Sequence, residues 1–345
     1  MAPIEVTVVT GFLGSGKTTL INRMLADPAL KDTAVIVNEF GEIAIDHLLV
    51  EKTSENIIEI AGGCLCCTVR GELAETLADL VERVGDGRIR KLDRIIVETT
   101  GLADPMPVLH AIQSDAMLRQ ALRIDRVIAT VDATMAEATL REHHEARLQI
   151  AAADIVVITK SDVAEAAQPA ELRAGIAERS AATILDAGAP DGHATRLLEI
   201  DVLSAPGRNR LHAGGHHHHS HQADVSAHVI TRAGPVARHA VEGFLDLLRS
   251  RTDLNILRIK GLVETADDPG RPLVVHGVRR MLYPATRLER WPERSARGTT
   301  LVVIGEGLNG EEIDRLFGAF IGEIRADTPD RAALENNPLA IPGTG

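Results

Sequence analysis

The sequence has 345 residues, of which 45% are hydrophobic, 25% are charged and only 2% are aromatic. This length accommodates two domains whose cores are built from Val, Ile, Leu and Ala. The net charge of −12 argues against binding to nucleic acids or anionic membranes, because both carry dense negative charge. No apolar run is long enough to span a bilayer and no signal peptide is recognisable, so we expect a cytoplasmic protein.

The first two-thirds of the chain alternates apolar runs with amphipathic stretches. The runs are rich in Val and Ile and predict strands buried on both faces of a sheet. The predicted strands are Ile4–Thr10, Ala34–Asn38, Ile57–Ile60, Arg94–Glu98, Arg126–Asp132 and Asp154–Thr159. The predicted helices are Lys17–Leu25, Thr68–Val84, Pro105–Arg119, Glu142–Ala152 and Pro169–Ser180. This alternation predicts an α/β domain with a doubly wound, mainly parallel sheet over residues 1–206.

A polar stretch rich in glycine and histidine follows, and we interpret residues 207–226 as a linker. Strands adjacent in sequence, with few helices, then predict a smaller C-terminal α+β domain over residues 227–326. Its predicted strands are Ala227–Arg232, Asn255–Glu264, Leu273–Tyr283 and Thr299–Glu306, and its predicted helices are Val236–Arg251 and Glu311–Ile321. Residues 327–345 are expected to form a flexible tail.

A glycine-rich loop joins the first predicted strand to the first predicted helix. Residues 11–18 match G-x-x-x-x-G-K-[ST], the P-loop pattern, in the strand–loop–helix context that the pattern requires. The glycines let backbone N–H groups face a phosphate, Lys17 supplies a positive charge, and Thr18 supplies a hydroxyl for Mg²⁺. The alternative is a glycine-rich turn that binds nothing. The predicted nucleotide-binding residues of this loop are Gly11, Gly14, Ser15, Gly16, Lys17, Thr18 and Thr19.

A second motif indicates which base is bound. Residues 159–162 read T-K-S-D at a strand end, close to the [NT]-K-x-D pattern of guanine recognition. The Asp162 carboxylate would accept hydrogen bonds from guanine N1–H and N2–H₂, and the Lys160 stem would pack over the base. Thr159 stands where Asn is more common. The motif favours GTP over ATP, with a helix-capping Asp as the alternative.

The strand predicted at 94–98 ends in E-T-T-G. A carboxylate at this place, Glu98, can hold Mg²⁺ or help to position the attacking water, and Gly101 can bring its N–H near the γ-phosphate. We therefore predict Lys17 and Glu98 as catalytic residues, and segments 98–105 and 38–42 as switches. An exposed acid without function is the alternative for Glu98.

All three cysteines lie in one segment, G-G-C-L-C-C-T at 62–68. Thiolates are soft ligands that suit Zn²⁺, Cu⁺ or iron–sulfur clusters, and a helix N-terminus favours the thiolate form. Three thiolates form an incomplete site, which suits metal transfer. Buried apolar cysteines and a redox-active pair are the alternatives. The predicted ligands are Cys64, Cys66 and Cys67, with Glu39, Glu42 and Asp46 as candidate additional ligands.

Histidines crowd the linker. Neutral imidazole is a common ligand of Zn, Ni, Co and Cu, so this segment is a candidate for weak metal collection, with a polar linker of no function as the alternative. The candidate ligands are His216, His217, His218, His219 and His221.

Together these motifs resemble those of the CobW-type GTPases, relatives of HypB and UreG. The matching segments are 11–20, 38–42, 62–69, 98–105 and 159–162, with L-R-I-K-G at 257–261 and V-V-H-G-V at 274–278. The resemblance covers nearly the whole chain. It implies a GTPase using GTP and Mg²⁺, whose cysteines bind Zn²⁺ (Co²⁺ in some branches) and which inserts metal into a client metalloprotein.

The resemblance also implies slow turnover in the absence of metal or client, and P-loop relatives often form homodimers. By its position, the C-terminal domain is the candidate for client recognition. Other functions stay open: cobalt delivery for cobalamin synthesis or nitrile hydratase maturation, an NTP-dependent enzyme with a structural zinc, and a metal-storage or sensor protein.

Overall fold

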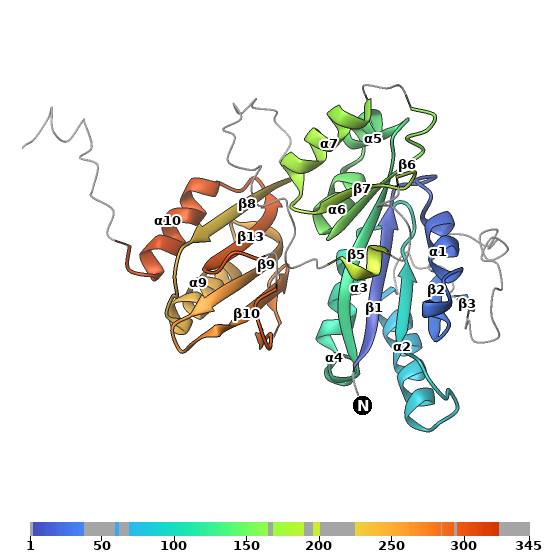
Figure 1. The fold of residues 1–345 in the computed structure, drawn as a ribbon, viewed down its shortest axis with the longest axis horizontal. Coiled ribbons are helices and arrows are strands. Elements are labelled where there is room, and N and C mark those ends of the chain that lie inside the picture. Colours follow the sequence, from blue (N-terminus) through green and yellow to red (C-terminus); the bar gives the residue numbers. More distant parts are fainter. Residues whose placement is uncertain are drawn as a thin grey trace, which may run out of the picture.

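A computed structural model describes residues 3–37, 59–61, 69–164, 168–189, 196–200, 225–283, 285–292 and 295–323. These residues form two β-sheets, one from each part of the chain, that lie side by side (Figure 1). Within the described residues, no helix has the length and apolar character needed to cross a membrane.

The N-terminal sheet has seven strands in the order β3-β2-β4-β1-β5-β6-β7, and every pair of neighbours is parallel. Its strands are β1 (Ile4–Gly11), β2 (Thr33–Val37), β3 (Glu59–Ala61), β4 (Arg94–Glu98), β5 (Leu122–Asp132), β6 (Ile155–Thr159) and β7 (Thr183–Asp186). The predicted parallel α/β sheet is therefore confirmed. The strand β7 was not predicted, and it extends the sheet beyond β6.

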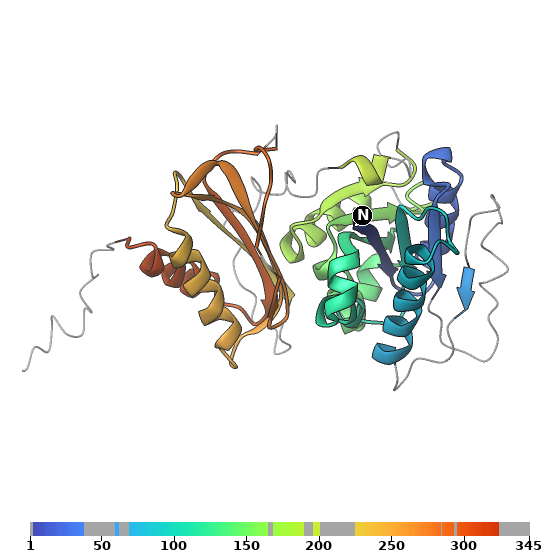
Figure 2. The ribbon, with the colours of Figure 1, turned by 90° about the horizontal axis from the view of Figure 1, so that it is seen from below.

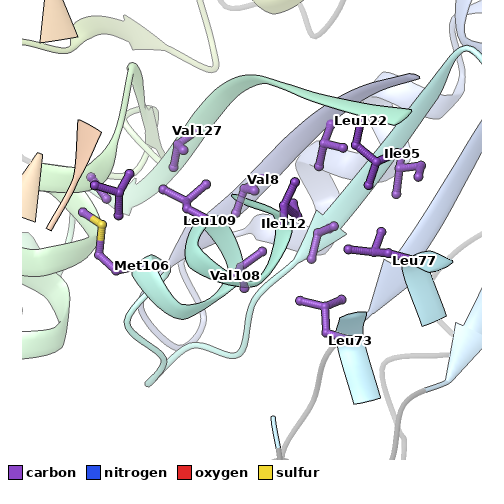
Figure 3. Packing of buried hydrophobic residues seen from close by; sticks show 14 of the residues in the cluster. Val8, Leu73, Leu77, Ile95, Met106, Val108, Leu109, Ile112, Leu122 and Val127 are labelled. Carbon is purple, nitrogen blue, oxygen red and sulfur yellow. The ribbon is translucent and has the colours of Figure 1, made fainter. Parts of the chain in front are cut away.

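Helices cover both faces of this sheet, because consecutive residues of each strand point to opposite sides and both sides are apolar. They are α1 (Lys17–Leu25), the 3₁₀ turn η1 (Pro28–Leu30), α2 (Val69–Gly85), α3 (Met106–Ser114), α4 (Ala116–Ala121), α5 (Ala136–Glu142), α6 (His144–Ala152), α7 (Gln168–Arg179) and α8 (Arg196–Glu199). In β1, Val8 packs towards α2 and α3, whereas Val9 packs towards α1. Figure 3 shows the first of these layers, where Leu77 of α2 and Ile112 of α3 lie over the strands.

Two predicted helices differ from those observed. The single helix predicted over 105–119 is wrong: the backbone is extended at Asp115, whose carboxylate accepts hydrogen bonds from Met117 N and Leu118 N and so caps a new helix, α4. The helix predicted from Glu142 begins at His144, because His143 is extended (φ −115°, ψ 116°) and separates α6 from the unpredicted α5.

The C-terminal sheet is antiparallel, with the order β11-β10-β9-β13-β8 and β12 paired to β10. Its elements are β8 (Val225–Arg232), α9 (Arg238–Ser250), β9 (Asn255–Thr265), β10 (Asp268–Val278), β11 (Met281–Leu282), β12 (Thr286–Arg287), β13 (Thr299–Glu306) and α10 (Gly310–Phe320). The predicted α+β character is confirmed. The strand predicted over 273–283 is wrong in its bounds, because β10 starts earlier and the chain turns at Arg279, with φ 51°.

The two faces of the C-terminal sheet have different neighbours. Helices α9 and α10 cover one face, where the rings of Phe244 and Phe317 meet edge to face with centroids 5.0 Å apart. Figure 2 shows that both helices lie on the side away from the parallel sheet. On the other face, Leu257 and Val278 belong to the same apolar cluster as Met106 of α3. The two sheets therefore share a core.

A buried ionic cluster also joins the two sheets. Asp154 lies just before β6, and its carboxylate is 3.0 and 3.1 Å from Nη2 of Arg258 and also contacts Lys260, both on β9. Burial alone would raise the pKa of Asp154, but these two cations outweigh it and hold the pKa below its usual range. Burial and the same cations keep the pKa of the neighbouring His276 well below its usual value. At neutral pH the cluster therefore contains a charged carboxylate and a neutral histidine.

Candidate nucleotide site and metal segment

Three sequence motifs meet at one edge of the parallel sheet. Because β1, β4 and β6 run in the same direction, the segments that follow them all leave from their carboxyl ends. These segments are the P-loop after β1, Glu98 at the end of β4, and T-K-S-D at the end of β6. In open α/β sheets this edge is where ligands bind.

The P-loop has the backbone that its glycines predict. Gly14 (φ 69°) and Gly16 (φ 91°) both have a left-handed backbone conformation, and Gly16 is the N-cap of α1. A Cβ atom at Gly11 would lie 2.7 Å from Ser15 Oγ, so the loop closes on itself too tightly for a side chain there. Lys17 is 9% exposed, and its Nζ donates to the carbonyl oxygens of Gly11 (3.1 Å) and Phe12 (3.3 Å). The ammonium therefore lies along the loop, beside the N-terminus of α1.

Two threonines fasten the P-loop to neighbouring strands. The hydroxyls of Ser15 and of Thr130 on β5 are 2.7 Å apart, and Thr159 Oγ1 on β6 donates to Ser15 O at 2.8 Å. Sequence analysis missed Thr130, because a threonine within a buried strand carries no signal of its own. Thr159, expected to belong to guanine recognition, contacts the phosphate loop.

Thr18 and Glu98 form the candidate Mg²⁺ site. Thr18 Oγ1 donates to Glu98 Oε1 at 2.9 Å, and Glu98 is only 4% exposed, so it is not the exposed strand-end acid of the alternative interpretation. A hydroxyl and a carboxylate are hard oxygen ligands of the kind Mg²⁺ prefers, and both lie beside the P-loop. The donor set therefore fits Mg²⁺.

The turn after β4 packs directly on the P-loop. A Cβ atom at Gly101 would lie 2.7 Å from Leu13 N and 2.8 Å from Leu13 Cα, so only glycine fits. On the other side of the turn, Gln149 Nε2 of α6 donates to Gly101 O (3.1 Å) and Ala103 O (3.0 Å). Gln149 is 1% exposed and was not among the predicted residues. The turn is thus held between the P-loop and α6.

The part of this sheet edge that is expected to recognise the base includes a residue outside the T-K-S-D motif. Lys160 has a left-handed backbone conformation (φ 56°), and its Nζ lies 2.7 Å from Asp132 Oδ2 at the end of β5. Burial would raise the pKa of Asp132, but hydrogen bonds from Lys160 and Thr134 outweigh it and lower that pKa. Asp162 is exposed beyond β6. Asp132 therefore fixes the direction of the lysine that is expected to cover the base.

A fourth loop reaches this edge from β7. Asp186 Oδ1 accepts hydrogen bonds from Ser161 Oγ (2.6 Å) and from Gly188 N (2.9 Å). The loop after β7 is thereby tied to the T-K-S-D segment. Asp186 was not predicted from the sequence, because the strand β7 was not predicted.

The candidate metal ligands lie outside the described residues. They are Cys64, Cys66, Cys67, Glu39, Glu42, Asp46, His216, His217, His218, His219 and His221. The flanking elements are described: β3 ends at Ala61 and α2 begins at Val69, so the cysteine segment follows the carboxyl end of a strand of the same sheet. In the part of the chain that the structure describes, no three His, Cys, Asp or Glu residues group as a metal site.

Family profiles match both parts of the chain. The profile of the CobW/HypB/UreG nucleotide-binding domain matches residues 5–184, which include every motif at this edge. The chain belongs to the CobW/HypB/UreG family. The profile of the cobalamin synthesis protein cobW C-terminal domain matches residues 225–321, which contain the antiparallel sheet. The resemblance read from the motifs is therefore confirmed.

Named relatives of this CobW-type chain cover nearly its whole length. The zinc chaperone YjiA of Escherichia coli (strain K12) is 35% identical over 323 residues, covering 92% of this chain and 98% of that protein. The zinc chaperone CobW of Pseudomonas aeruginosa is 36% identical, and the matched region covers 90% of this chain and 89% of that protein. A crystal structure of the Zn(II)-bound YjiA GTPase from E. coli superimposes with a TM-score of 0.65 at 29% identity, covering 93% and 99% of the two chains.

Proposed function

We propose that this protein is a GTP-hydrolysing metallochaperone that binds Zn²⁺ through its cysteine segment and delivers it to a client metalloprotein. The observation that carries the proposal is the shared sheet edge: the P-loop, the Thr18–Glu98 pair and the carboxyl end of β3, which leads into the cysteine segment, all lie there. The zinc chaperones among the relatives support the same conclusion.

The nucleotide roles follow from the geometry of the edge. The amides of the loop, at Gly11, Gly14, Ser15, Gly16 and Thr19, and the ammonium of Lys17 would bind the phosphates. Thr18 and Glu98 would hold Mg²⁺, which neutralises charge on the β- and γ-phosphates when bound. Asp162 would read the guanine edge, with Lys160 over the base and Thr159 holding the loop below. Glu98, next to the hydroxyl of Thr18, would also orient the attacking water.

The metal is cargo in this proposal. Cys64, Cys66 and Cys67 would hold Zn²⁺ as thiolates, and their position ahead of the N-terminus of α2 favours the ionised form. Glu39 and Glu42 are proposed as additional ligands. Histidines 216–219 and His221, within the proposed linker 207–226, would collect metal weakly. Co²⁺ is the rival cargo, since the same ligands bind both ions.

We also propose that the nucleotide controls metal affinity. The segment that follows β2 contains Glu39 and Glu42, and β2 lies beside β4, which ends at Glu98. A γ-phosphate that orders both segments would therefore change the ligands around the cysteines. The C-terminal domain, 227–326, would recognise the client, with turnover in the cytoplasm slow until metal or client is present. A homodimer is compatible with this scheme.

The test is a titration of the tag-free protein with Zn²⁺ and with Co²⁺, in the presence of GDP and then of a non-hydrolysable GTP analogue. A Cys64/Cys66/Cys67→Ala triple variant is the comparison, and His216/His217/His218→Ala is the matched control that removes ligands from the linker only. We expect the tight site to vanish in the cysteine variant alone and its affinity to depend on the nucleotide. Tight binding that survives loss of the cysteines, or equal affinity in both nucleotide states, would contradict the proposal.

A further inference from the structure

A buried amide lies behind the turn that follows Glu98. Gln149 projects from α6 and is 1% exposed, and its Nε2 donates to two carbonyl oxygens, those of Gly101 and Ala103. Both partners are acceptors, so the nitrogen of the amide must face them. One side chain therefore holds both ends of the turn, although it lies 48 residues away from Gly101 in sequence.

The opposite side of the same turn is fixed by the phosphate loop. Gly101 packs against the backbone of Leu13 without room for a Cβ atom. The backbone N–H of Thr99 donates to Val9 O of β1 at 2.9 Å, and the hydroxyls of Thr99 and Thr10 are 2.8 Å apart. The turn is thus clamped between the P-loop and the amide of Gln149, and a change on either side moves Gly101.

We infer that Gln149 is a positioning residue for GTP hydrolysis: by holding the carbonyls of Gly101 and Ala103, it orients the Gly101 N–H towards the γ-phosphate. Gln149 is buried behind the turn, so it would act through the turn. This inference rests on the proposed GTPase function. A preorganised donor costs no reorganisation when charge develops on the phosphate, which is why the orientation of one N–H group matters. The competing explanation is that the amide only satisfies two buried carbonyls and stabilises the fold.

The two explanations predict different effects on GTP hydrolysis and on the binding of ligands that carry a γ-phosphate. A positioning role predicts that Gln149→Leu, which leaves both carbonyls without this donor, lowers kcat by about 10²-fold, the cost of a misplacement on the order of 1 Å. The same variant should weaken binding of a non-hydrolysable GTP analogue while GDP affinity stays unchanged, because GDP lacks the phosphate that Gly101 faces. Gln149→Met keeps roughly the length of the side chain and removes the donor, so it should behave in the same way.

Gln113 provides the matched control. It is a buried glutamine (8% exposed) on α3, and among the described residues no hydrogen bond joins its side chain to the turn. Gln113→Leu makes the same replacement at another buried glutamine and should leave kcat and the affinity ratio of analogue to GDP at wild-type values. If Gln149→Leu unfolds, the Gln149→Met variant gives the same ratio, measured after its circular dichroism is shown to match wild type.

The outcomes separate the inference from the proposed function. If the wild type hydrolyses GTP and both Gln149 variants retain its kcat and its analogue-to-GDP affinity ratio, the positioning role is wrong. If the wild type hydrolyses no GTP with or without Zn²⁺, the proposed function fails first. In that case an unchanged affinity ratio in the Gln149 variants overturns the inference as well, and a lowered ratio upholds the contact with the γ-phosphate.

Discussion

The nucleotide edge and the contact between the two sheets both bury polar side chains, but they neutralise them in different ways. At the contact, the carboxylate of Asp154 meets Arg258 and Lys260, so the charges are paired within the protein. At the edge, the Lys160–Asp132 ion pair stands beside hydrogen bonds of Ser15 and Gln149 that run between neutral hydroxyl, amide and carbonyl groups. The contact thus pairs a carboxylate with cations of the protein, whereas we propose that the edge orients groups around a charged ligand.

This difference separates stability from activity. Removing a charge at the contact leaves its partners buried and uncompensated, which costs folding free energy. Removing a neutral group at the edge is expected to change how the proposed nucleotide phosphates are held and to leave the packed core intact. The following five predictions test that separation.

The largest effect is expected at the contact. Asp154→Asn keeps the shape of the side chain but leaves the buried Arg258 and the partly buried Lys260 without their counter-charge, so the free energy of unfolding should fall by about 3–5 kcal/mol. Urea denaturation measures it. Asp93→Asn is the control, because its ion pair with Lys91 is exposed; it should change stability by less than about 1 kcal/mol. Equal effects of the two variants would mean that the buried cluster contributes no more than a surface pair.

The next effect belongs to the edge. Thr18→Ala removes a proposed Mg²⁺ ligand and the hydroxyl that donates to Glu98, so kcat/KM for GTP should fall by about 10²- to 10³-fold while the urea midpoint stays close to wild type. Ser250→Ala, which removes an exposed hydroxyl at the end of α9, should keep full activity. A Thr18 variant that loses stability and not activity would break the comparison.

Gly101→Ala should disturb both properties. The new Cβ atom would meet Leu13 N and Cα at 2.7 and 2.8 Å, and overpacking of this kind costs about 1–3 kcal/mol. The P-loop would be displaced, so GTP turnover should fall as well. Gly85→Ala is matched to it, since a Cβ atom there meets nothing within 4 Å. The control should be neutral or slightly stabilising, and a neutral Gly101→Ala would show that the turn can move away from the P-loop.

Acid should affect the contact through Asp154. Its pKa is lowered in the folded protein, so its stabilising contribution is present above the unfolded pKa of about 3.9 and is lost as the pH falls towards the folded value. The stability of the wild type should therefore fall more steeply below about pH 4 than that of Asp154→Asn, by about 1.4 kcal/mol for each pH unit over which only the unfolded carboxyl is protonated. Parallel curves in this range would contradict the charged state of Asp154.

The smallest effect is expected at Arg279, whose guanidinium is 2.8 Å from Asp104 and 44% exposed. Arg279→Ala should cost about 0.2–1 kcal/mol, as exposed ion pairs do. Arg279→Gly also removes the pair but relieves the left-handed backbone, so it should be more stable than Arg279→Ala by about 1 kcal/mol. Thermal unfolding of both variants separates the pair from the strain, and equal melting temperatures would show that the backbone stores none.

The parts of the candidate site that are encoded by local motifs were predictable from the sequence. The P-loop, Glu98 and the T-K-S-D segment each follow an apolar strand, and parallel strands necessarily bring their carboxyl ends together. Gln149, Thr130 and Asp186 were missed because their contacts join distant segments, as with the 115 residues between Ser15 and Thr130. No local pattern marks such a pair.

A weak signal in the sequence points to the contact between the sheets. Arg258 and Lys260 alternate with apolar residues in L-R-I-K-G, so both point to the same face of β9, where two cations need a buried acid. Which acid it is could not be read from the sequence, because Asp154 follows a helix in the other domain. The fold class was predictable from periodicity; the breaks at Asp115 and His143 depend on single extended residues within helical patterns.

Helix α6 joins the two regions compared above. Gln149 holds the turn beside the P-loop, and one helical turn later the carbonyl of Ala152 accepts a hydrogen bond from Arg258 of β9. A short helix moves as a rigid unit, so displacement of the turn also displaces the partner of Arg258. Thermodynamic linkage makes such coupling reciprocal. Any molecule that binds the C-terminal sheet and shifts β9 would then change the affinity for nucleotide by the same factor by which nucleotide changes the affinity for that molecule.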